Sequence, residues 1–141
     1  MTAVTDNYGY QLTMLIDNIE RHQSLNDVGT ICKFLEQLVR DIGFRVIAGP
    51  LSTSGPFPSE HTGVSAVVIL YESHAAIHTY MNVRSAFIDV FGCRDFCLDK
   101  VNSVIHLFFG EHRVTEMHYA PRGSNWSQNA AVELDKWQAT R

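Results

Sequence analysis

The run "VSAVVIL" (64–70) restricts the fold more than any other part of the sequence. It is almost wholly apolar and rich in β-branched residues, and it is far too short for a helix that crosses a membrane. We therefore expect a buried β-strand here. The next ten residues, "YESHAAIHTY", place a carboxylate, a hydroxyl and two histidines directly after that strand. A cluster of polar groups at the end of a core strand indicates a site with a chemical role.

Residue patterns on both sides of this run predict the remaining elements. Apolar residues at helical spacing predict amphipathic helices within 25–43 and 94–110, ended by Gly43 and Gly110. Two helices among mainly antiparallel strands predict an α+β fold, a two-layer α/β sandwich with both helices on one face of the sheet. The other face would be free to meet a partner. The predicted strands are 10–17, 44–48, 64–71, extended residues up to 80, 85–91 and 113–120, with a loop at 49–63 and a short helix at 129–138.

Composition limits the classes of function. A chain of 141 residues with 45% hydrophobic and 18% charged residues is expected to form one domain, 1–141. Its net charge of −4 and the absence of a Lys/Arg stripe argue against nucleic acid as a partner. No signal peptide pattern or membrane-length apolar stretch is visible, so we expect no membrane association. Three cysteines cannot all pair, which favours reduced thiols in the cytoplasm.

A zinc-binding module is one interpretation of the polar cluster. His74 and His78 form H-x3-H, and Cys93 and Cys97 form C-x3-C, which together make a Cys2His2 set. In extended structure, however, residues four apart lie ~13 Å from each other. Cys97 also fits the apolar stripe of the second predicted helix. We therefore expect no metal and keep zinc as an alternative.

An ordinary strand end, which turns at Ser73 and leaves His74 and His78 partly exposed, is a second interpretation. A self-modifying serine is the third. If the backbone is strained at Glu72–Ser73, the Ser73 hydroxyl can attack the carbonyl of Glu72 and convert the amide into an ester. A base that removes the α-proton of Ser73 would then eliminate the ester, cleave the chain and leave a pyruvoyl group, and His78 has a suitable intrinsic pKa. Because 73 and 78 differ by an odd number, a regular strand would direct their side chains to opposite faces, so the mechanism needs a bend or bulge between them.

The segment 63–93 resembles the small prokaryotic S-adenosylmethionine decarboxylases, self-cleaving pyruvoyl enzymes of polyamine synthesis. The resemblance implies an α/β sandwich fold, and protomers that commonly pair, here as a homodimer. It rests on Gly63-Val64-Ser65, Glu72-Ser73-His74, Ile77-His78-Thr79 and the pattern from Asp89 to Cys93.

The same resemblance implies a role for each matched residue. Ser73 is the precursor of a covalent pyruvoyl cofactor, which forms a Schiff base with the α-amine of an amino-acid-type substrate and accepts electrons on decarboxylation. Cleavage after Glu72 would give a β chain of residues 1–72 and an α chain of residues 73–141. His78 resembles the processing base, Ser65 a residue that assists processing, and Cys93 the acid that returns a proton to the substrate.

The chain departs from the family pattern in the regions expected to bind substrate. After Ile-His-Thr it reads "YMNVR", with Asn82 where the family has an acidic residue that binds the ribose hydroxyls. S-adenosylmethionine is the family default, with Phe57 and Tyr80 as candidates to stack on adenine. L-Ornithine or L-arginine is an alternative substrate, whose terminal cation would need Glu60 or Asp95. A non-catalytic homologue that binds a partner enzyme is an alternative of another class.

Overall fold

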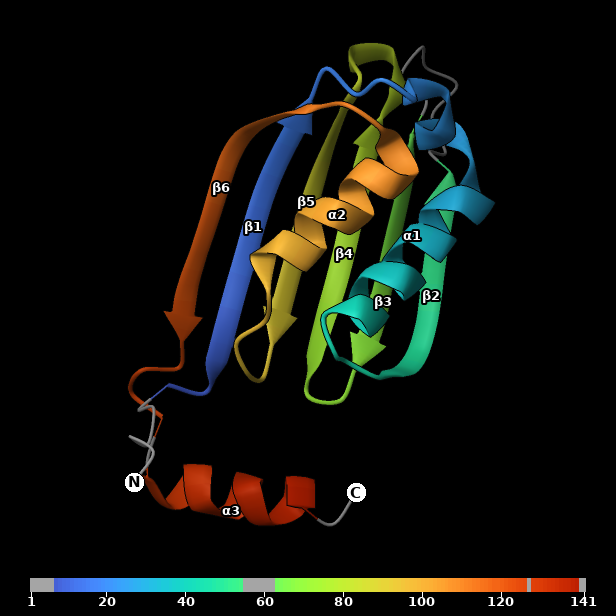
Figure 1. Cartoon of the computed structure of the whole chain (residues 1–141). Helices are drawn as coiled ribbons and strands as arrows, with labels where there is room; N and C mark the ends of the chain where they lie inside the picture. Colours follow the sequence, from blue (N-terminus) through green and yellow to red (C-terminus); the bar gives the residue numbers. More distant parts are fainter. Residues whose placement is uncertain (1–6, 55–62, 127, 140–141) are drawn as a thin grey trace.

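The computed structural model describes residues 7–54, 63–126 and 128–139. Six strands form one antiparallel sheet in the order β2-β3-β4-β5-β1-β6 (Figure 1). The strands are β1 (Gly9–Asp17), β2 (Val46–Ser54), β3 (Val64–Leu70), β4 (Ser73–Tyr80), β5 (Ser85–Gly92) and β6 (Arg113–Arg122). The helices are α1 (Val28–Asp41), α2 (Leu98–Phe109) and α3 (Gln128–Ala139), with 3-10 turns η1 (His22–Asn26) and η2 (Met81–Val83).

Helices α1 and α2 lie on one face of the sheet and enclose the core (Figure 1). Most of the apolar stripe predicted for the first helix is buried, namely Ile31, Leu35, Leu38, Val39 and Ile42, whereas Val28 and Cys32 are only partly buried. Phe34, which the predicted stripe did not include, is buried too and packs against Phe109 of α2. Gly43 follows this helix with φ +88°, the left-handed conformation expected of it. The α+β sandwich with helices on one face is therefore confirmed. None of the helices in the described ranges is long and apolar enough to cross a membrane.

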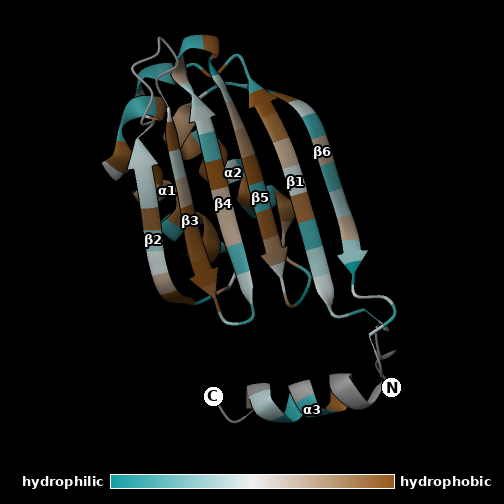
Figure 2. Cartoon of the chain, turned by 180° about the vertical axis from the view of Figure 1, so that it is seen from behind, coloured by the Kyte–Doolittle hydropathy of each residue, from teal (hydrophilic) through white to brown (hydrophobic). Residues whose placement is uncertain are grey.

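On the opposite face of the sheet, which we call the open face, no helix of the described residues covers the strands (Figure 2). Large apolar side chains are nevertheless exposed there: Leu51 is 73%, Ile69 50% and Phe87 45% exposed. Side chains alternate strictly along β4, with odd-numbered residues buried toward the helices and even-numbered ones on the open face. This alternation decides which of the polar groups after the apolar strand can meet.

Two predicted boundaries are wrong. The strand predicted at 44–48 runs from Val46 to Ser54, so the first six residues of the predicted loop belong to β2. Pro50 fits because β2 is an edge strand, where a missing N–H removes no ladder hydrogen bond, and the register shifts around it. Helix α2 begins at Leu98 instead of near Arg94, because Phe96 is buried and its N–H donates to Tyr119 Oη at 3.0 Å.

A buried threonine ties the start of β3 to β4 and to η1. Thr79 Oγ1 accepts a hydrogen bond from the N–H of Val64 at 2.8 Å and donates one to the carbonyl of Leu25 at 2.5 Å. The chain passes this point at Gly63, where a Cβ would lie 1.9 Å from the carbonyl oxygen of Thr79. Glycine and threonine of the matched motifs thus have structural roles in this chain.

Replacing Thr79 with valine is expected to lower the free energy of unfolding by about 1–3 kcal/mol, because two buried backbone groups lose their partner. Urea unfolding at one fixed protein concentration measures the change in this free energy. The reference protein and the Thr79→Val variant both also carry Ser73→Ala, so that neither chain is cleaved. Thr53→Val is the control, since Thr53 is exposed and donates only to the carbonyl of Ser54, and its effect should stay within about 0.5 kcal/mol. Equal effects of the two changes would contradict the assignment.

Candidate active site

The turn between β3 and β4 holds the peptide bond singled out from the sequence. Leu70 pairs with Ser73, so Tyr71 and Glu72 alone make the turn. Glu72 has φ 63°, and only two other non-glycine residues in the described ranges have a positive φ. A left-handed non-glycine residue costs on the order of 1–3 kcal/mol. The Glu72–Ser73 bond is therefore preceded by a strained backbone.

Ser73 is the first residue of β4 and is buried, with 7% of its surface exposed. Its hydroxyl donates a hydrogen bond to the carbonyl of Tyr71 at 3.0 Å. This bond keeps Oγ at the turn, next to the carbonyl that it would attack. The buried position also keeps the hydroxyl from free contact with bulk water.

A tyrosine distant in sequence contacts the same turn. Tyr8 Oη donates a hydrogen bond to the carbonyl oxygen of Glu72 at 2.9 Å. Burial, together with the nearby Glu72 and Cys93, raises the pKa of Tyr8 to about 12. The phenol therefore remains protonated near neutral pH. Sequence reasoning missed this residue, since it lies 64 positions from Glu72 in no recognisable motif.

Cys93 lies at the same end of the sheet. β5 ends at Gly92, and since His74 pairs with Phe91, Ser73 is level with Gly92, one residue before the cysteine. The start of β1, the β3–β4 turn and the end of β5 lie side by side at the lower edge of the sheet in Figure 1. We call this group of Tyr8, Glu72, Ser73 and Cys93 the turn site.

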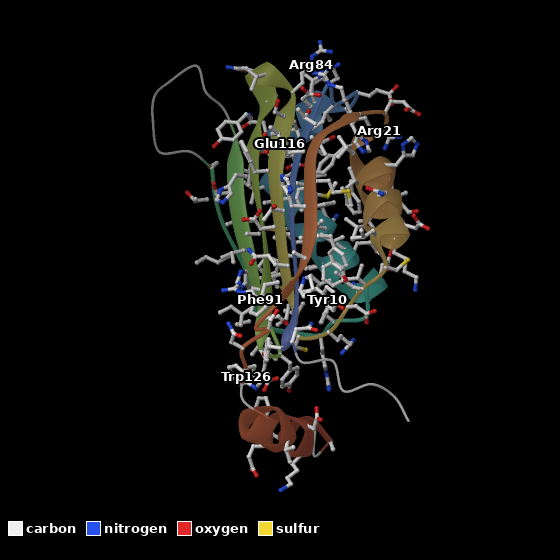
Figure 3. The ribbon with its side chains drawn as sticks, turned by 90° about the vertical axis from the view of Figure 1, so that its left-hand side faces the viewer. Tyr10, Arg21, Arg84, Phe91, Glu116 and Trp126 are labelled. Carbon is white, nitrogen blue, oxygen red and sulfur yellow. The ribbon has the colours of Figure 1, made fainter. Side chains whose placement is uncertain are left out.

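A pocket of about 440 Å³ borders the turn site. Figure 3 shows Phe91 and Trp126 toward this end of the molecule. The guanidinium of Arg122 lies 4.1 Å from the centre of the Phe91 ring, a cation–π contact. Aromatic rings, the Arg122 cation and Glu72 line a cavity of the size and mixed character typical of a small-molecule site. The lining residues are Tyr8, Glu72, Phe91, Arg122, Gly123 and Trp126.

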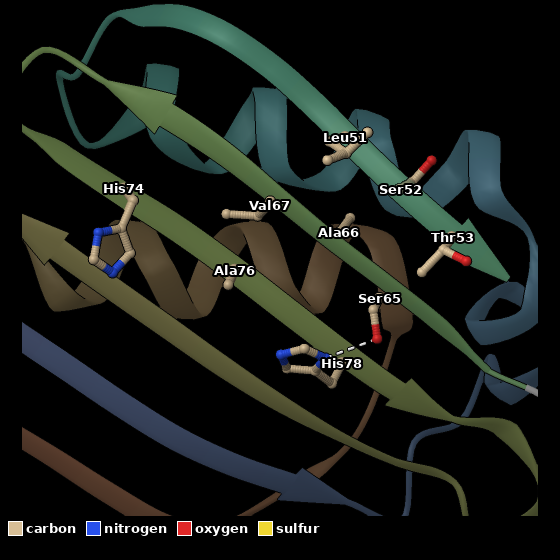
Figure 4. Close-up of a pocket in the computed structure, with 9 residues that line it drawn as sticks. All are labelled: Leu51, Ser52, Thr53, Ser65, Ala66, Val67, His74, Ala76 and His78. Atoms are coloured by element: carbon tan, nitrogen blue, oxygen red, sulfur yellow. Dashed lines mark hydrogen bonds between the residues drawn. The ribbon is translucent and has the colours of Figure 1, made fainter. Parts of the chain in front are cut away.

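His78 and Ser65 form a second group, away from the turn site. They are paired across β3 and β4, and Ser65 Oγ lies 2.8 Å from His78 Nδ1 (Figure 4). His78 is on the open face whereas Ser73 is buried on the other, and five residues of strand separate them by ~16 Å. The register of β4 is regular, so the bend required for an in-chain mechanism is absent. Within one chain, His78 does not reach Ser73.

The serine–histidine pair borders a shallow pocket of about 540 Å³ on the open face, over β2, β3 and β4 (Figure 4). His74 lies at the other end of this pocket, nearer the turn site. The floor between the two histidines is aliphatic. Its lining residues are Leu51, Ser52, Thr53, Ser65, Ala66, Val67, His74, Ala76 and His78.

The remaining candidates for substrate binding are dispersed. Tyr80 lies exposed on the open face with its ring edge against Phe87, and Asn82 is exposed in η2. Asp95 is exposed, two residues after Cys93. Phe57 and Glu60 lie outside the described residues.

The four proposed zinc ligands are not brought together in one chain. His74 and His78 both lie on the open face, four residues apart along β4. Cys97 is exposed at the start of α2, not on the buried stripe where the sequence placed it. Among the described residues, no three His, Cys, Asp or Glu side chains are grouped closely enough to hold a metal ion.

Comparisons with known proteins confirm the family resemblance. The family model described as S-adenosylmethionine decarboxylase matches residues 13–123. Two relatives called S-adenosylmethionine decarboxylase proenzyme, from Methanococcus maripaludis strains C5 and C6, are each 36% identical to this chain over 72 residues. Those matches span 51% of this chain and 55% of each relative, so the chain spans about half the length of the curated relatives it matches.

The fold has a close counterpart among solved structures. The crystal structure of the adenosylmethionine decarboxylase from Aquifex aeolicus VF5 superposes with a TM-score of 0.66 and 22% identity. The match covers 83% of this chain and 92% of that one, which establishes a common fold. The fold and turn site are thus those of a small α+β protein with a serine at a strained hairpin. By the family match over most of its length, the chain belongs to the S-adenosylmethionine decarboxylase family.

Proposed function

We propose that the chain is the proenzyme of a pyruvoyl-dependent S-adenosylmethionine decarboxylase of polyamine biosynthesis, which cleaves itself between Glu72 and Ser73. The observation that carries this proposal is the left-handed Glu72 directly before a buried serine. The family match and the proenzyme names of the Methanococcus maripaludis relatives support it. Three cysteines, all free, fit an enzyme of the reducing cytoplasm.

Self-cleavage balances with the atoms at the turn site and water. Ser73 Oγ bonds to the carbonyl carbon of Glu72, and the peptide C–N bond breaks, which turns the amide into an ester and frees the amine of Ser73. Loss of the Ser73 α-proton expels Glu72 as a carboxylate and leaves a dehydroalanine. Its tautomer takes up water and releases ammonia, so residue 73 ends as a pyruvoyl group.

The surroundings of Ser73 fit this group. The side chain is buried at the start of a strand, and a pocket of about 440 Å³ borders the adjoining Glu72. Once formed, a pyruvoyl carbonyl supplies an electron sink for the pair of electrons that decarboxylation leaves on the substrate. The chain must then donate a proton to the α-carbon of the substrate. Cys93 is the proposed donor, because it is the thiol nearest to this turn in chain position and sheet register.

Cys93→Ala is expected to split like the wild type but to release carbon dioxide roughly 10²–10⁴ times more slowly, because a positioned acid typically contributes that factor. Intact mass measures the splitting, and carbon dioxide release from S-adenosylmethionine measures kcat. The matched control is Cys97→Ala, an exposed thiol outside the turn site, which should leave both readouts unchanged. Full activity in Cys93→Ala would exclude the thiol as the proton donor.

We further propose that two copies pair through the open face as a homodimer. In one chain His78 and Ser73 lie on opposite faces of the sheet. A second copy packed on the open face would cover its exposed aliphatic side chains. The pocket by the turn site adjoins this face, because its lining residue Phe91 pairs with His74. The His78–Ser65 pair of one copy would therefore approach the Glu72–Ser73 peptide of the other copy through this pocket, at the edge of the sheet. Burial of such an apolar face is the usual driving force for stable association.

S-adenosylmethionine is the proposed substrate. The aromatic rings of Phe91 and Trp126 in the pocket by the turn site suit an adenine and a sulfonium better than a short aliphatic amine. The test is carbon dioxide release from carboxyl-labelled S-adenosylmethionine, L-ornithine and L-arginine, each supplied separately, with Ser73→Ala as the blank. Release from S-adenosylmethionine alone is expected; release only from ornithine or arginine would overturn the substrate and direct attention to Asp95.

A further inference from the structure

The hydroxyl of Tyr8 contacts the one carbonyl that self-cleavage must attack. Oη lies 2.9 Å from the carbonyl oxygen of Glu72 and donates to it. Enzymes stabilise the charge that develops during acyl transfer with N–H or O–H donors directed at the position that the oxyanion takes. Tyr8 Oη already contacts the oxygen on which that charge would form. The contact is made before cleavage, at the strained turn itself.

Several distant segments hold the Tyr8 ring in this position. The ring packs against Phe91 of β5, with centroids 5.6 Å apart, and against Trp126, at 5.2 Å. The N–H of Tyr8 donates to the carbonyl of Gly123 at 3.3 Å. The chain then enters β1 at Gly9, where a Cβ would lie 2.0 Å from the carbonyl oxygen of Gly92. Glycine therefore permits the close approach that sets Tyr8 beside the end of β5.

We propose that Tyr8 is a catalytic residue of the self-cleavage, where its hydroxyl stabilises the negative charge that forms on the Glu72 carbonyl oxygen. The inference rests on the proposed function, because it assigns a further group to the same cleavage. When Ser73 Oγ bonds to the carbonyl carbon, the π electron pair of the C=O bond moves onto that oxygen. The proton of Ser73 passes to a base, and the pair returns as the C–N bond breaks. Tyr8 keeps its own proton throughout.

The protonation state of Tyr8 suits this task. Burial and the neighbouring Glu72 and Cys93 raise its pKa to about 12, so the hydroxyl is a donor over the whole physiological range. Hydrogen bonds to a charged acceptor are about twice as strong as those to a neutral one. The contact therefore stabilises the addition intermediate more than the intact amide.

Tyr8→Phe tests this directly, because it removes the hydroxyl and keeps the ring between Phe91 and Trp126. Chains made by cell-free translation would be sampled over time, and intact mass would give the first-order rate of splitting. We expect Tyr8→Phe to split roughly 10²–10³ times more slowly than the wild type, the loss typical for one removed oxyanion donor. The matched control is Tyr10→Phe, a neighbouring tyrosine whose ring stacks on Tyr119, and it should split at the wild-type rate.

The outcomes separate the two proposals. A wild type that never splits would refute self-cleavage itself, whereas a folded Tyr8→Phe chain that splits as fast as a splitting wild type would refute only the role of Tyr8. If Tyr8→Phe fails to fold, a fluorinated tyrosine of lower pKa at position 8 keeps the packing. The rate of splitting should then fall as the pH rises, because the phenol loses its proton, and this fall should occur at a lower pH than in the wild type. An unshifted pH profile would overturn the inference, because a merely structural tyrosine predicts no such shift.

Discussion

Purified Ser73→Ala protein is expected to show one mass, that of the unbroken chain of 141 residues. The wild type should show two, for residues 1–72 and 73–141, the second without a free N-terminal amine. The difference follows because Ser73 Oγ belongs to the residue directly after the strained Glu72 and is held at the turn, 3.0 Å from the carbonyl of Tyr71. Decarboxylation should fall to background in the same variant, since no electron sink can form. Mass spectrometry of the denatured protein and a carbon dioxide assay measure both effects.

A matched control is Ser103→Ala. Ser103 lies in α2, is exposed and donates to the carbonyl of Asp99 at 2.9 Å, so its loss should leave splitting and activity intact. Splitting of the Ser73→Ala chain at residue 73 would exclude the serine as the nucleophile. A wild type still unbroken after prolonged incubation would remove the basis of the pyruvoyl proposal.

Two inactive variants are expected to restore each other when they are expressed together. His78→Ala and Ser73→Ala should each stay unsplit alone. In a mixed pair, the Ser73→Ala copy supplies His78 to the intact Ser73 of the other copy, so the His78→Ala chain should split and the Ser73→Ala chain should not. The expectation rests on the proposed homodimer, because within one chain His78 and Ser73 lie on opposite faces of β4 and cannot meet. Tags of different mass identify which chain is cut.

The controls for this experiment are direct. Pairing His78→Ala with the double variant Ser73→Ala/His78→Ala removes every processing base and should give no fragments. His118→Ala, an exposed histidine on β6, should split normally when expressed alone. Splitting of the His78→Ala chain alone would show that His78 is not required. Failure of the mixed pair, while dimers form, would place the base within the same chain.

Local patterns predicted most of the fold because they reflect local chemistry. The apolar stripe that includes Leu35 and Leu38 and the left-handed Gly43 define α1, as expected. The apolar run at 64–70 is a strand as expected, but only one of its faces is buried in the core. The error at 49–54 has a physical cause. A segment that contains proline and glycine is typical of a loop, but this one pairs with β3 as the edge strand of the sheet, where a proline can be accommodated. Likewise, Cys97 matched a helical period, but the chain before Leu98 is extended and anchored by Phe96.

The candidate site was only partly accessible from sequence. The odd separation of residues 73 and 78 already indicated that their side chains point to opposite faces of a regular strand. The regular register of β4 with β3 shows no bend that would bring them to the same face. Tyr8 could not be found this way, because its contact with Glu72 depends on how β1 enters the sheet beside β5. Contacts between residues far apart in the chain come from the topology, which one sequence does not display.

The strand order also has a consequence for the proposed cleavage. Fragment 1–72 supplies β1, β2 and β3, and fragment 73–141 supplies β4, β5 and β6, yet β1 lies between β5 and β6. The ladders β3–β4, β5–β1 and β1–β6 therefore join the two fragments, which are interleaved and cannot separate without dismantling the sheet. Once unfolded, the cut protein must reassemble from two molecules, at a rate that depends on their concentration. The uncut chain folds as one molecule without this dependence on concentration, so the topology favours a proposed order in which the chain folds first and is cleaved afterwards.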